Sequence, residues 1–105
     1  MSPIPGDVYL VDLGMVAKER PMVVVSRHDP DAPRALSLCV PFTTKNRGSH
    51  YEVAIGRCSF LREPSWANVQ GTIAVGYEKL LRRLGRLTTA QYSEVKMALR
   101  YALEL

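Results

Sequence analysis

The short polar loop Thr43–His50, with the sequence TTKNRGSH, has the clearest chemical character in the chain. Its first five residues supply two hydroxyls, two cations and an amide, and the loop has no acid: Thr43, Thr44, Lys45, Arg47 and Asn46. Cations attract phosphate oxygens, and hydroxyls and amides donate hydrogen bonds to them. The loop therefore predicts contacts with the phosphates of a nucleic acid. An ordinary hairpin loop could have the same composition, and the loop alone does not decide between the two.

A second group of charges lies directly before an apolar segment. The stretch KERPMVVVS places Lys18, Glu19 and Arg20 ahead of Pro21 and the apolar run Met22–Val25. Three residues of this run are β-branched, which predicts a short buried strand. Pro21 fixes the backbone where that strand begins. The sequence thus holds an arginine at the rim of the core.

The other side chains that could do acid–base or metal chemistry favour simpler interpretations. Histidine is a common general acid and base, but His28 and His50 lie in separate polar loops, so we interpret them as surface residues. Asp29 and Asp31 belong to the segment DPDAP and are typical of a turn. No serine has a neighbouring His and Asp at an informative spacing, so the sequence gives no support for a serine hydrolase.

Charge and cysteine usage limit the class of protein. The net charge is +4 and the chain is 47% hydrophobic over 105 residues, which predicts one globular domain, residues 1–105, with a basic surface. A basic surface fits nucleic acid, an anionic membrane or an acidic protein.

The sequence also indicates where the protein is located. The N-terminal residues lack a signal peptide pattern, and no apolar run is long enough to span a membrane, so we expect a cytoplasmic protein. Cys39 and Cys58 fit no metal spacing and are expected to be small apolar thiols.

The elements that must position these groups are short strands followed by a helix. The predicted strands are Asp7–Leu13, Pro21–Ser26, Leu36–Thr44, His50–Gly56 and Ser65–Val75, with an edge or bulge at Pro41 and a bend at Gly71. Tyr77–Gly85 is predicted as a short helical turn. It contains part of a basic cluster that could contact nucleic acid or be a solvated helix face: Lys79, Arg82, Arg83 and Arg86.

A full helix is predicted over residues 88–105. Thr88 and Gln91 have the spacing of a capping box, in which each side chain bonds a free backbone N–H at the helix start. One face is apolar: Tyr92, Val95, Ala98, Leu99, Ala102 and Leu103. The pattern predicts a mainly β fold with a C-terminal helix (α+β). The sheet is either open with the helix to one side or, given the little core available to each strand, a partly closed antiparallel barrel.

The order of the segments carries more information than any one of them. GDVYLVDL is followed by ERPMVVVS, CVPFTTKNRG, YEV, SWANVQ, LLRRLGRLT and a terminal helix. This order resembles the MazF/PemK family of toxins, the ribosome-independent mRNA endonucleases of toxin–antitoxin systems, over nearly the whole chain. The resemblance implies a small SH3-like barrel with helical additions. It also implies a homodimer, no metal or other cofactor, and inhibition by an antitoxin whose acidic, flexible C-terminal tail covers the RNA site.

The resemblance implies a catalytic pair at Arg20 and Thr43. The implied reaction is attack of the ribose 2′-OH on the adjacent phosphorus, which forms a 2′,3′-cyclic phosphate and releases the 5′-oxygen. Arg20 suits the stabilisation of charge on the phosphoryl oxygens, and Thr43 suits orientation of the phosphate or the 2′-OH. The general base is left open, with Glu19 as the nearest carboxylate in the sequence. We expect substrate contacts from residues flanking the pair and from a later glutamine: Lys18, Glu19, Thr44, Lys45, Asn46, Arg47 and Gln70.

Two departures from the family limit what the resemblance implies. The segment Gly14–Glu19 is shorter than the loop that helps to hold RNA in many relatives, so no sequence preference follows. Some relatives have Arg-x-Asp-Gln on a later strand for acid–base work, whereas this chain has Ala67-Asn68-Val69-Gln70. That difference favours Arg20 and Thr43 as the reacting pair. Gln70 could contact RNA or be a buried structural residue.

Two alternatives to RNA cleavage remain open at this stage. CcdB-type toxins share the fold but poison DNA gyrase through a C-terminal tryptophan, whereas this chain ends RYALEL and its only tryptophan is Trp66. A relative without activity that only binds RNA or an antitoxin is the other alternative. Incubation with single-stranded RNA in EDTA would separate all three.

Overall fold

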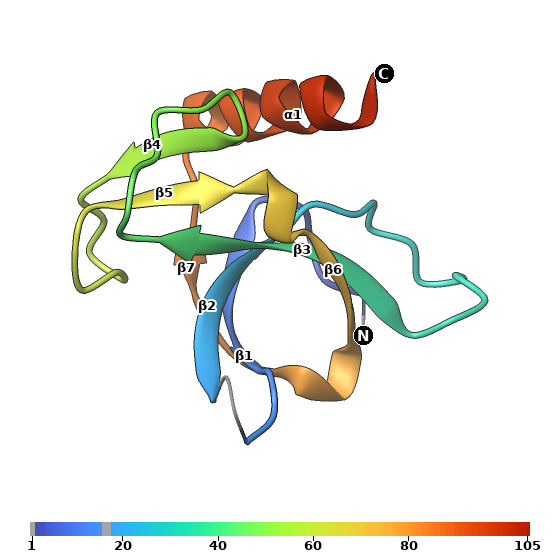
Figure 1. The fold of residues 1–105 in the computed structure, drawn as a ribbon. Coiled ribbons are helices and arrows are strands. Elements are labelled where there is room, and N and C mark those ends of the chain that lie inside the picture. The colour runs from blue at the N-terminus through green and yellow to red at the C-terminus, as the bar shows by residue number, and fades with distance from the viewer. Residues whose placement is uncertain (1, 16–17) are drawn as a thin grey trace.

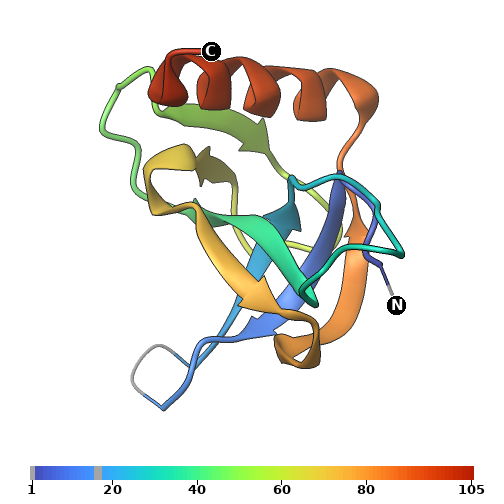
Figure 2. The same cartoon turned by 90° about the vertical axis from the view of Figure 1, so that its right-hand side faces the viewer.

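The fold is a curved antiparallel sheet with one α-helix packed across it, as a computed structural model of residues 2–15 and 18–105 shows (Figure 1). The elements in chain order are β1 (Asp7–Asp12), β2 (Glu19–Val24), β3 (Leu36–Thr43), β4 (Glu52–Gly56), β5 (Ser65–Asn68), η1 (Val69–Gly71), β6 (Ile73–Gly76), η2 (Tyr77–Lys79), β7 (Leu80–Arg86) and α1 (Thr89–Leu103). Figure 2 shows that α1 lies over β4 at one end of the molecule, while the sheet curls below it.

The strands pair in the order β4-β5-β3-β2-β1-β7, and β6 adds a further partner to β3. β3 has three partner strands. One edge pairs with β2, while the first half of the other edge, up to Cys39, pairs with β6 and its last residues, Phe42 and Thr43, pair with β5. Pro41 lies between these two stretches, which fits the irregular position predicted for it. In the described part of the chain β4 and β7 do not pair with each other, so the sheet stays open. The mainly β fold with a C-terminal helix is therefore confirmed, and the partly closed barrel takes the form of a curved, open sheet.

The curvature gives the sheet an apolar core on each face. On the face covered by α1, Val23 packs with Val8 and with Val95 of the helix. On the other face, Met22 and Val24 pack with buried residues that include Val75 of β6. The consecutive residues Met22, Val23 and Val24 are all buried because alternate side chains enter different cores. β2 is therefore anchored in both cores, and this anchoring holds the start of the strand, which carries Arg20.

A buried carboxylate ties β1 to β7. Asp7 is 6% exposed, and its carboxylate accepts a 2.7 Å bond from Arg86 and lies 3.3 Å from Arg83. A buried carboxylate loses much of its solvation free energy, and the ion pairs with Arg83 and Arg86 offset this loss. Two members of the predicted basic cluster therefore stabilise the fold.

The segment predicted as a helical turn, Tyr77–Gly85, is mostly a strand. Only Tyr77–Lys79 forms a 3-10 turn, and Leu80–Arg86 forms β7 along the edge of β1. Backbone pairing to that edge overrides the weak helical preference of the leucines and arginines. The predicted long strand Ser65–Val75 is likewise divided by η1 into β5 and β6, near the bend expected at Gly71.

The helix prediction holds in most details. Thr88 is the N-cap, and the capping box with Gln91 is complete, with backbone-to-side-chain bonds of 2.8 and 3.1 Å. Val95 and Ala98 are buried as predicted, whereas Leu103 is 62% exposed because it lies at the C-terminal end, beyond the sheet-facing residues. No helix in the described residues is long and apolar enough to cross a bilayer. Cys39 and Cys58 are both free thiols, and burial raises the pKa of Cys39 to about 12.

Candidate functional site

A pocket of about 590 Å³ opens where the start of β2 and the end of β3 come together. Its lining is drawn from β1, β2, β3 and the residue after it, β5, β7 and the segment between β4 and β5: Leu10, Glu19, Arg20, Pro21, Phe42, Thr43, Thr44, Phe60, Leu61, Arg62, Glu63, Ser65, Arg82 and Leu84. Arg20 and Thr43, which lie 23 positions apart in the sequence, are thus brought to one cavity. Of the other predicted contact residues, Glu19 and Thr44 also line it.

Strand register explains why Arg20 and Thr43 meet. β2 and β3 pair from Val24 opposite Cys39 to Met22 opposite Pro41. The same register carried on by two residues sets Arg20 against Thr43, and directly opposed residues of antiparallel strands present their side chains on one face. The β2–β3 ladder ends at Met22 and Pro41, while Arg20 stays paired with Val11 of β1 and Thr43 pairs with Trp66 of β5. Both Arg20 and Thr43 line the pocket beyond the end of this ladder.

The pocket has an apolar floor and a charged rim. Six apolar side chains line it: Leu10, Pro21, Phe42, Phe60, Leu61 and Leu84. Three arginines and two glutamates surround them: Arg20, Arg62, Arg82, Glu19 and Glu63. An apolar, partly aromatic floor suits a nucleobase, and a rim with excess positive charge suits its phosphate.

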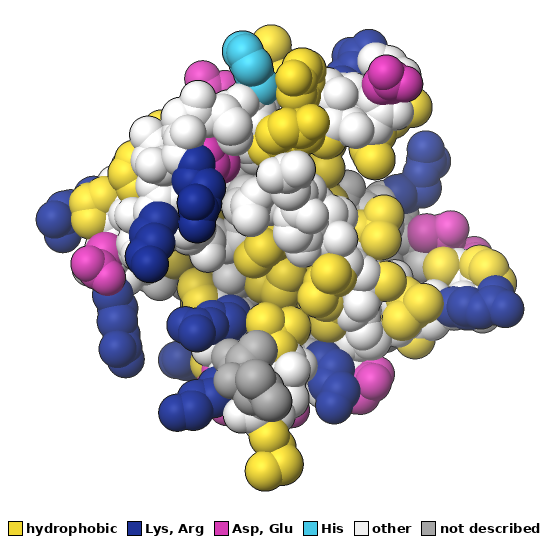
Figure 3. Space-filling model, viewed as in Figure 1, with side chains coloured by type: hydrophobic (Ala, Val, Ile, Leu, Met, Phe, Trp, Pro, Cys, Tyr) yellow, Lys and Arg dark blue, Asp and Glu magenta, His cyan; other side chains and the backbone are white. Residues whose placement is uncertain are grey.

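In the described part of the chain, no acidic side chain forms an ion pair with the rim arginines, so their charge is available to a ligand. Within the described residues the ion pairs are those of Asp7 with Arg83 and Arg86, and neither arginine lines the pocket. Arg20 and Arg82 are exposed and enter no ion pair in that part of the chain. Figure 3 shows Lys and Arg side chains gathered on the left-hand side of the molecule, the side on which the segment between β4 and β5 projects in Figure 1. A polyanion approaching this side meets a favourable field.

The loop after β3 is shaped by its own side chains. The Thr43 hydroxyl accepts a 3.1 Å bond from the N–H of Lys45, and the Asn46 side chain accepts one of 2.8 Å from the N–H of Gly48. Because Thr43 uses an oxygen lone pair for this bond, its hydroxyl proton can still be donated to a ligand. The loop thus fixes the position of the Thr43 oxygen at the rim.

A carboxylate closes the far end of this loop. Glu52 accepts bonds from the backbone N–H groups of Arg47 and Ser49 and from the Ser49 hydroxyl, at 3.0 to 3.3 Å. Partial desolvation raises the pKa of Glu52, but the hydrogen bonds from Ser49 and Arg47 outweigh it and lower the pKa overall. The loop contains no acid of its own, so Glu52 of β4 supplies the acceptor that its N–H groups need.

Several predicted contact residues lie outside the pocket. Lys45, Asn46 and Arg47 are exposed in the loop that leads away from it. Lys18 lines a shallow surface at the β1–β2 turn, and residues 16 and 17 of the short segment Gly14–Glu19 lie outside the described residues. Gln70 is exposed in η1, so the interpretation as a buried glutamine is wrong, and its contact with RNA stays a prediction.

The wall formed by the segment between β4 and β5 is the part of the site that sequence reasoning missed. Phe60, Leu61, Arg62 and Glu63 come from RCSFLREP, the segment between the predicted strands His50–Gly56 and Ser65–Val75. The available signal was the pair Phe60–Leu61, since two large apolar residues in a polar loop indicate anchoring to a core. Both pack against the core below α1.

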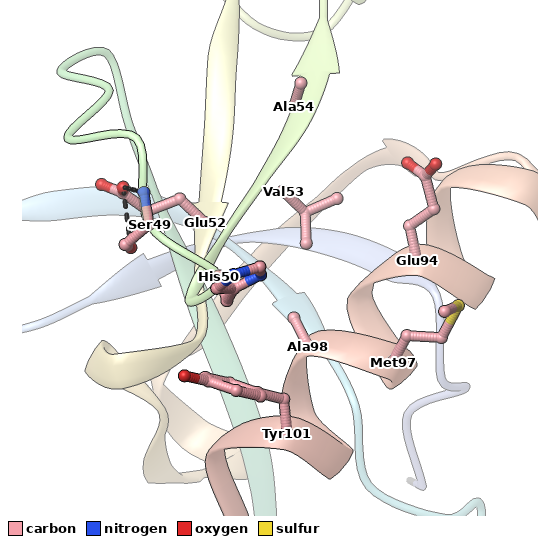
Figure 4. A pocket seen from close by; sticks show the side chains of 9 residues that line it. All are labelled: Ser49, His50, Glu52, Val53, Ala54, Glu94, Met97, Ala98 and Tyr101. Carbon is pink, nitrogen blue, oxygen red and sulfur yellow. Dashed lines mark hydrogen bonds between the residues drawn. The ribbon is translucent and has the colours of Figure 1, made fainter.

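A second hollow, of about 540 Å³, lies between α1 and the start of β4 (Figure 4). His50 and Tyr101 flank it with ring centroids 5.2 Å apart, and Val53 and Ala98 project toward it. The Glu52 carboxylate at its edge is already engaged by Ser49, as the dashed lines in Figure 4 mark. His28 lies elsewhere, with Nδ1 2.8 Å from the carbonyl oxygen of Ser2, so the two histidines form no acid–base pair.

No three His, Cys, Asp or Glu side chains in the described residues are grouped to hold a metal ion. The polar groups that line the pocket with Arg20 and Thr43 are guanidinium, hydroxyl and carboxylate groups.

Comparisons with known proteins agree with one another. Residues 4–103 match the family model of the PemK-like, MazF-like toxin of type II toxin–antitoxin systems. An endoribonuclease from a mycobacterial species is similar in structure, with a TM-score of 0.83 and 28% identity, over 100% of this chain and 94% of that chain. A mycobacterial endoribonuclease in complex with its cognate antitoxin has a TM-score of 0.85 and 30% identity, over 99% and 97% of the two chains.

A more distant structure has the same fold. The Mycobacterium tuberculosis toxin MazF-mt6 matches with a TM-score of 0.81 and 24% identity, over 94% of this chain and 97% of that one. No curated protein sequence gives a significant match.

Proposed function

The chain belongs to the PemK-like, MazF-like toxins of type II toxin–antitoxin systems, and from this we propose that it is an endoribonuclease that cleaves single-stranded mRNA with Arg20 and Thr43 as its reacting pair. The observation that carries the proposal is the meeting of these two side chains at the mouth of one pocket with an apolar floor and a basic rim. The whole chain, residues 1–105, is proposed to act as one toxin domain in the cytoplasm, where mRNA is available.

The proposed reaction uses the substrate's own hydroxyl as the nucleophile. The 2′-oxygen forms a bond to the adjacent phosphorus while the bond from phosphorus to the 5′-oxygen breaks. The products are a 2′,3′-cyclic phosphate and a 5′-hydroxyl, so no water is added in this step. Negative charge builds on the non-bridging oxygens in the transition state, and the planar Arg20 guanidinium can bind two of them at once. A preorganised donor of this kind typically contributes about 10²–10³ in rate.

Thr43 is proposed to orient the phosphate. Its hydroxyl keeps its proton near neutral pH and its neutral oxygen is only weakly basic, but it can donate a hydrogen bond to a phosphate oxygen. The bond from Lys45 N–H sets the position of the Thr43 oxygen before the substrate binds. This reduces the free-energy cost of ordering the Thr43 side chain on binding. Arg62 and Arg82 suit the phosphates of neighbouring nucleotides, and the apolar floor suits one base.

The experiment that tests this function is incubation of the purified protein with single-stranded RNA in EDTA. We expect cleavage that EDTA does not slow, because arginine and hydroxyl groups need no metal for this reaction. Single-stranded DNA of the same sequence should stay intact. If EDTA stops cleavage, or if the DNA is cut equally well, the proposed mechanism is wrong.

We propose two protein partners, an acidic antitoxin segment and a second copy of the chain. The basic rim suits an acidic, flexible tail that competes with RNA, and such binding should weaken as salt rises. A tail peptide that binds together with RNA at this pocket would contradict that proposal. The mycobacterial endoribonuclease at 30% identity was solved with its cognate antitoxin, which supports it.

The proposed homodimer is supported by uncovered apolar surface. Large hydrophobic side chains are exposed on both the sheet and the helix: Leu36, Leu38, Ile73, Leu81, Met97, Tyr101, Leu103 and Leu105. Figure 3 shows hydrophobic side chains across the middle of the face over β3 and β6 and again beside α1. Surfaces of this kind mark protein–protein contacts. We propose a two-fold dimer that brings two Thr43–His50 loops to one groove, and sedimentation equilibrium that finds only monomer at micromolar concentration would exclude it.

A further inference from the structure

The segment Arg57–Pro64, between β4 and β5, is built as a fixed wall of the pocket. The Phe60 ring lies against the backbone of Gly85 in β7 so closely that a β-carbon there would overlap it. Further along the chain, the buried Ser65 hydroxyl of β5 donates a 2.9 Å bond to the carbonyl oxygen of Glu63. A wall held in its middle and where it enters β5 can present a side chain at a defined place without reordering when substrate binds.

The proposed reaction needs a group that takes the proton from the attacking 2′-OH. Among the described residues that line the pocket, only two side chains can accept a proton near neutral pH, Glu19 and Glu63. The arginines hold their protons, and the threonine and serine hydroxyls are too weakly basic. The base is therefore to be sought between two carboxylates.

The two carboxylates reach the pocket from different sides of β3. Glu19 precedes Arg20 on β2 and is paired with Asp12 at the β1–β2 turn. Glu63 lies in the segment that enters β5, and β5 pairs with β3 through Trp66 and Thr43. Arg20 and Glu63 thus reach the pocket from the two neighbours of β3, the strand that carries Thr43. With this arrangement Arg20 can neutralise the non-bridging oxygens of a phosphate while Glu63 accepts the proton of the attacking hydroxyl.

We propose that Glu63 is the general base of the reaction, an inference that rests on the proposed function. The Glu63 carboxylate takes the proton of the 2′-OH as the 2′-oxygen bonds to phosphorus. The bond from phosphorus to the 5′-oxygen breaks, and the leaving oxygen takes a proton from solvent water. Glu63 then returns its proton to solvent, which closes the cycle with no further reactant.

Four other charged side chains line the pocket with Glu63. They are Glu19 and Arg20 on β2, Arg62 beside it and Arg82 on β7, while Thr43 at the end of β3 and Thr44 after it contribute hydroxyls. A general base must be unprotonated to act, so cleavage should slow at acid pH as the Glu63 carboxylate takes up a proton.

The test is Glu63→Gln, measured as kcat and KM on single-stranded RNA across pH. General bases typically contribute about 10²–10⁴ in rate, and we expect kcat to fall about 100-fold with KM changed little. The slowing of wild-type cleavage at acid pH should disappear in this variant. Glu63→Asp, which keeps a carboxylate, should recover part of kcat together with the acid slowing. Glu94→Gln on α1, outside the pocket, is the matched control and should behave as wild type.

The outcomes separate this inference from the function itself. A folded Glu63→Gln variant with wild-type kcat and wild-type acid slowing would overturn Glu63 as the base while RNA cleavage stands. Loss of the acid slowing in Glu19→Gln, with retention in Glu63→Gln, would assign the base to Glu19 and overturn the inference equally. A wild-type protein that leaves RNA intact would remove the proposed function and the inference with it. Thermal melts of every variant verify that each one is folded.

Discussion

Replacing Arg20 by lysine should lower the rate of RNA cleavage about 10²- to 10³-fold, the effect typical of removing a preorganised donor to a developing oxyanion. Lysine keeps the positive charge but loses the planar pair of N–H donors that can hold two phosphate oxygens. The loss should appear mainly in kcat, because the paired contact matters most when charge builds up in the transition state. Steady-state cleavage of a short RNA oligonucleotide measures it.

The fold should survive this substitution. Arg20 is exposed at the start of β2, while the buried residues of that strand begin at Met22, so lysine disturbs neither core. Arg34→Lys, at an exposed position between β2 and β3, is the matched control and should leave the rate unchanged. Wild-type cleavage by a well-folded Arg20→Lys variant would mean that Arg20 is only a solvated cation.

Removing a single 2′-hydroxyl from the substrate should abolish cleavage at that position. The wild-type protein is first used to map its cut in an all-RNA oligonucleotide. A second oligonucleotide then carries deoxyribose at the nucleotide on the 5′ side of the cut. Because that hydroxyl is the proposed nucleophile, no cyclic phosphate can form without it. Gel or mass analysis should show no product from this bond even after long incubation.

The position of the deoxyribose supplies the control. Deoxyribose on the 3′ side of the cut leaves the nucleophile in place, and this oligonucleotide should still be cleaved. Cleavage of the bond next to the missing hydroxyl would indicate attack by water and would contradict the proposed mechanism.

The sequence predicted the elements whose determinants are local. The capping box of Thr88 and Gln91 satisfies helix N–H groups within one turn, so its presence in the sequence was enough to place the start of α1. Pro21 and the valines after it likewise indicated a strand, although β2 begins two residues before Pro21, at Glu19, because its first residues pair with β1. The prediction that this strand start carries Arg20 to a rim agrees with its exposure and its place in the pocket.

Features that depend on distant partners were not predicted. Leu80–Arg86 forms a strand because the edge of β1 lies beside it, and Arg83 and Arg86 there reach the buried Asp7. Glu63 lines the pocket with Arg20 on a segment in which Phe60 packs against Gly85, a contact between residues 25 positions apart. Neither the Asp7 ion pairs nor the Phe60–Gly85 contact produces a periodic pattern in the sequence. The wall of the pocket could therefore be identified only from the structure.

The most direct measurement is the mass of the fragments released from one RNA oligonucleotide by the protein in EDTA. Transfer to the 2′-oxygen predicts that each upstream fragment ends in a 2′,3′-cyclic phosphate and each downstream fragment begins with a 5′-hydroxyl. The cyclic ester is lighter by one water than a linear 3′-phosphate, so mass spectrometry distinguishes the two. Upstream fragments with a free 3′-hydroxyl and downstream fragments with a 5′-phosphate would contradict cleavage by Arg20 and Thr43 through the ribose hydroxyl.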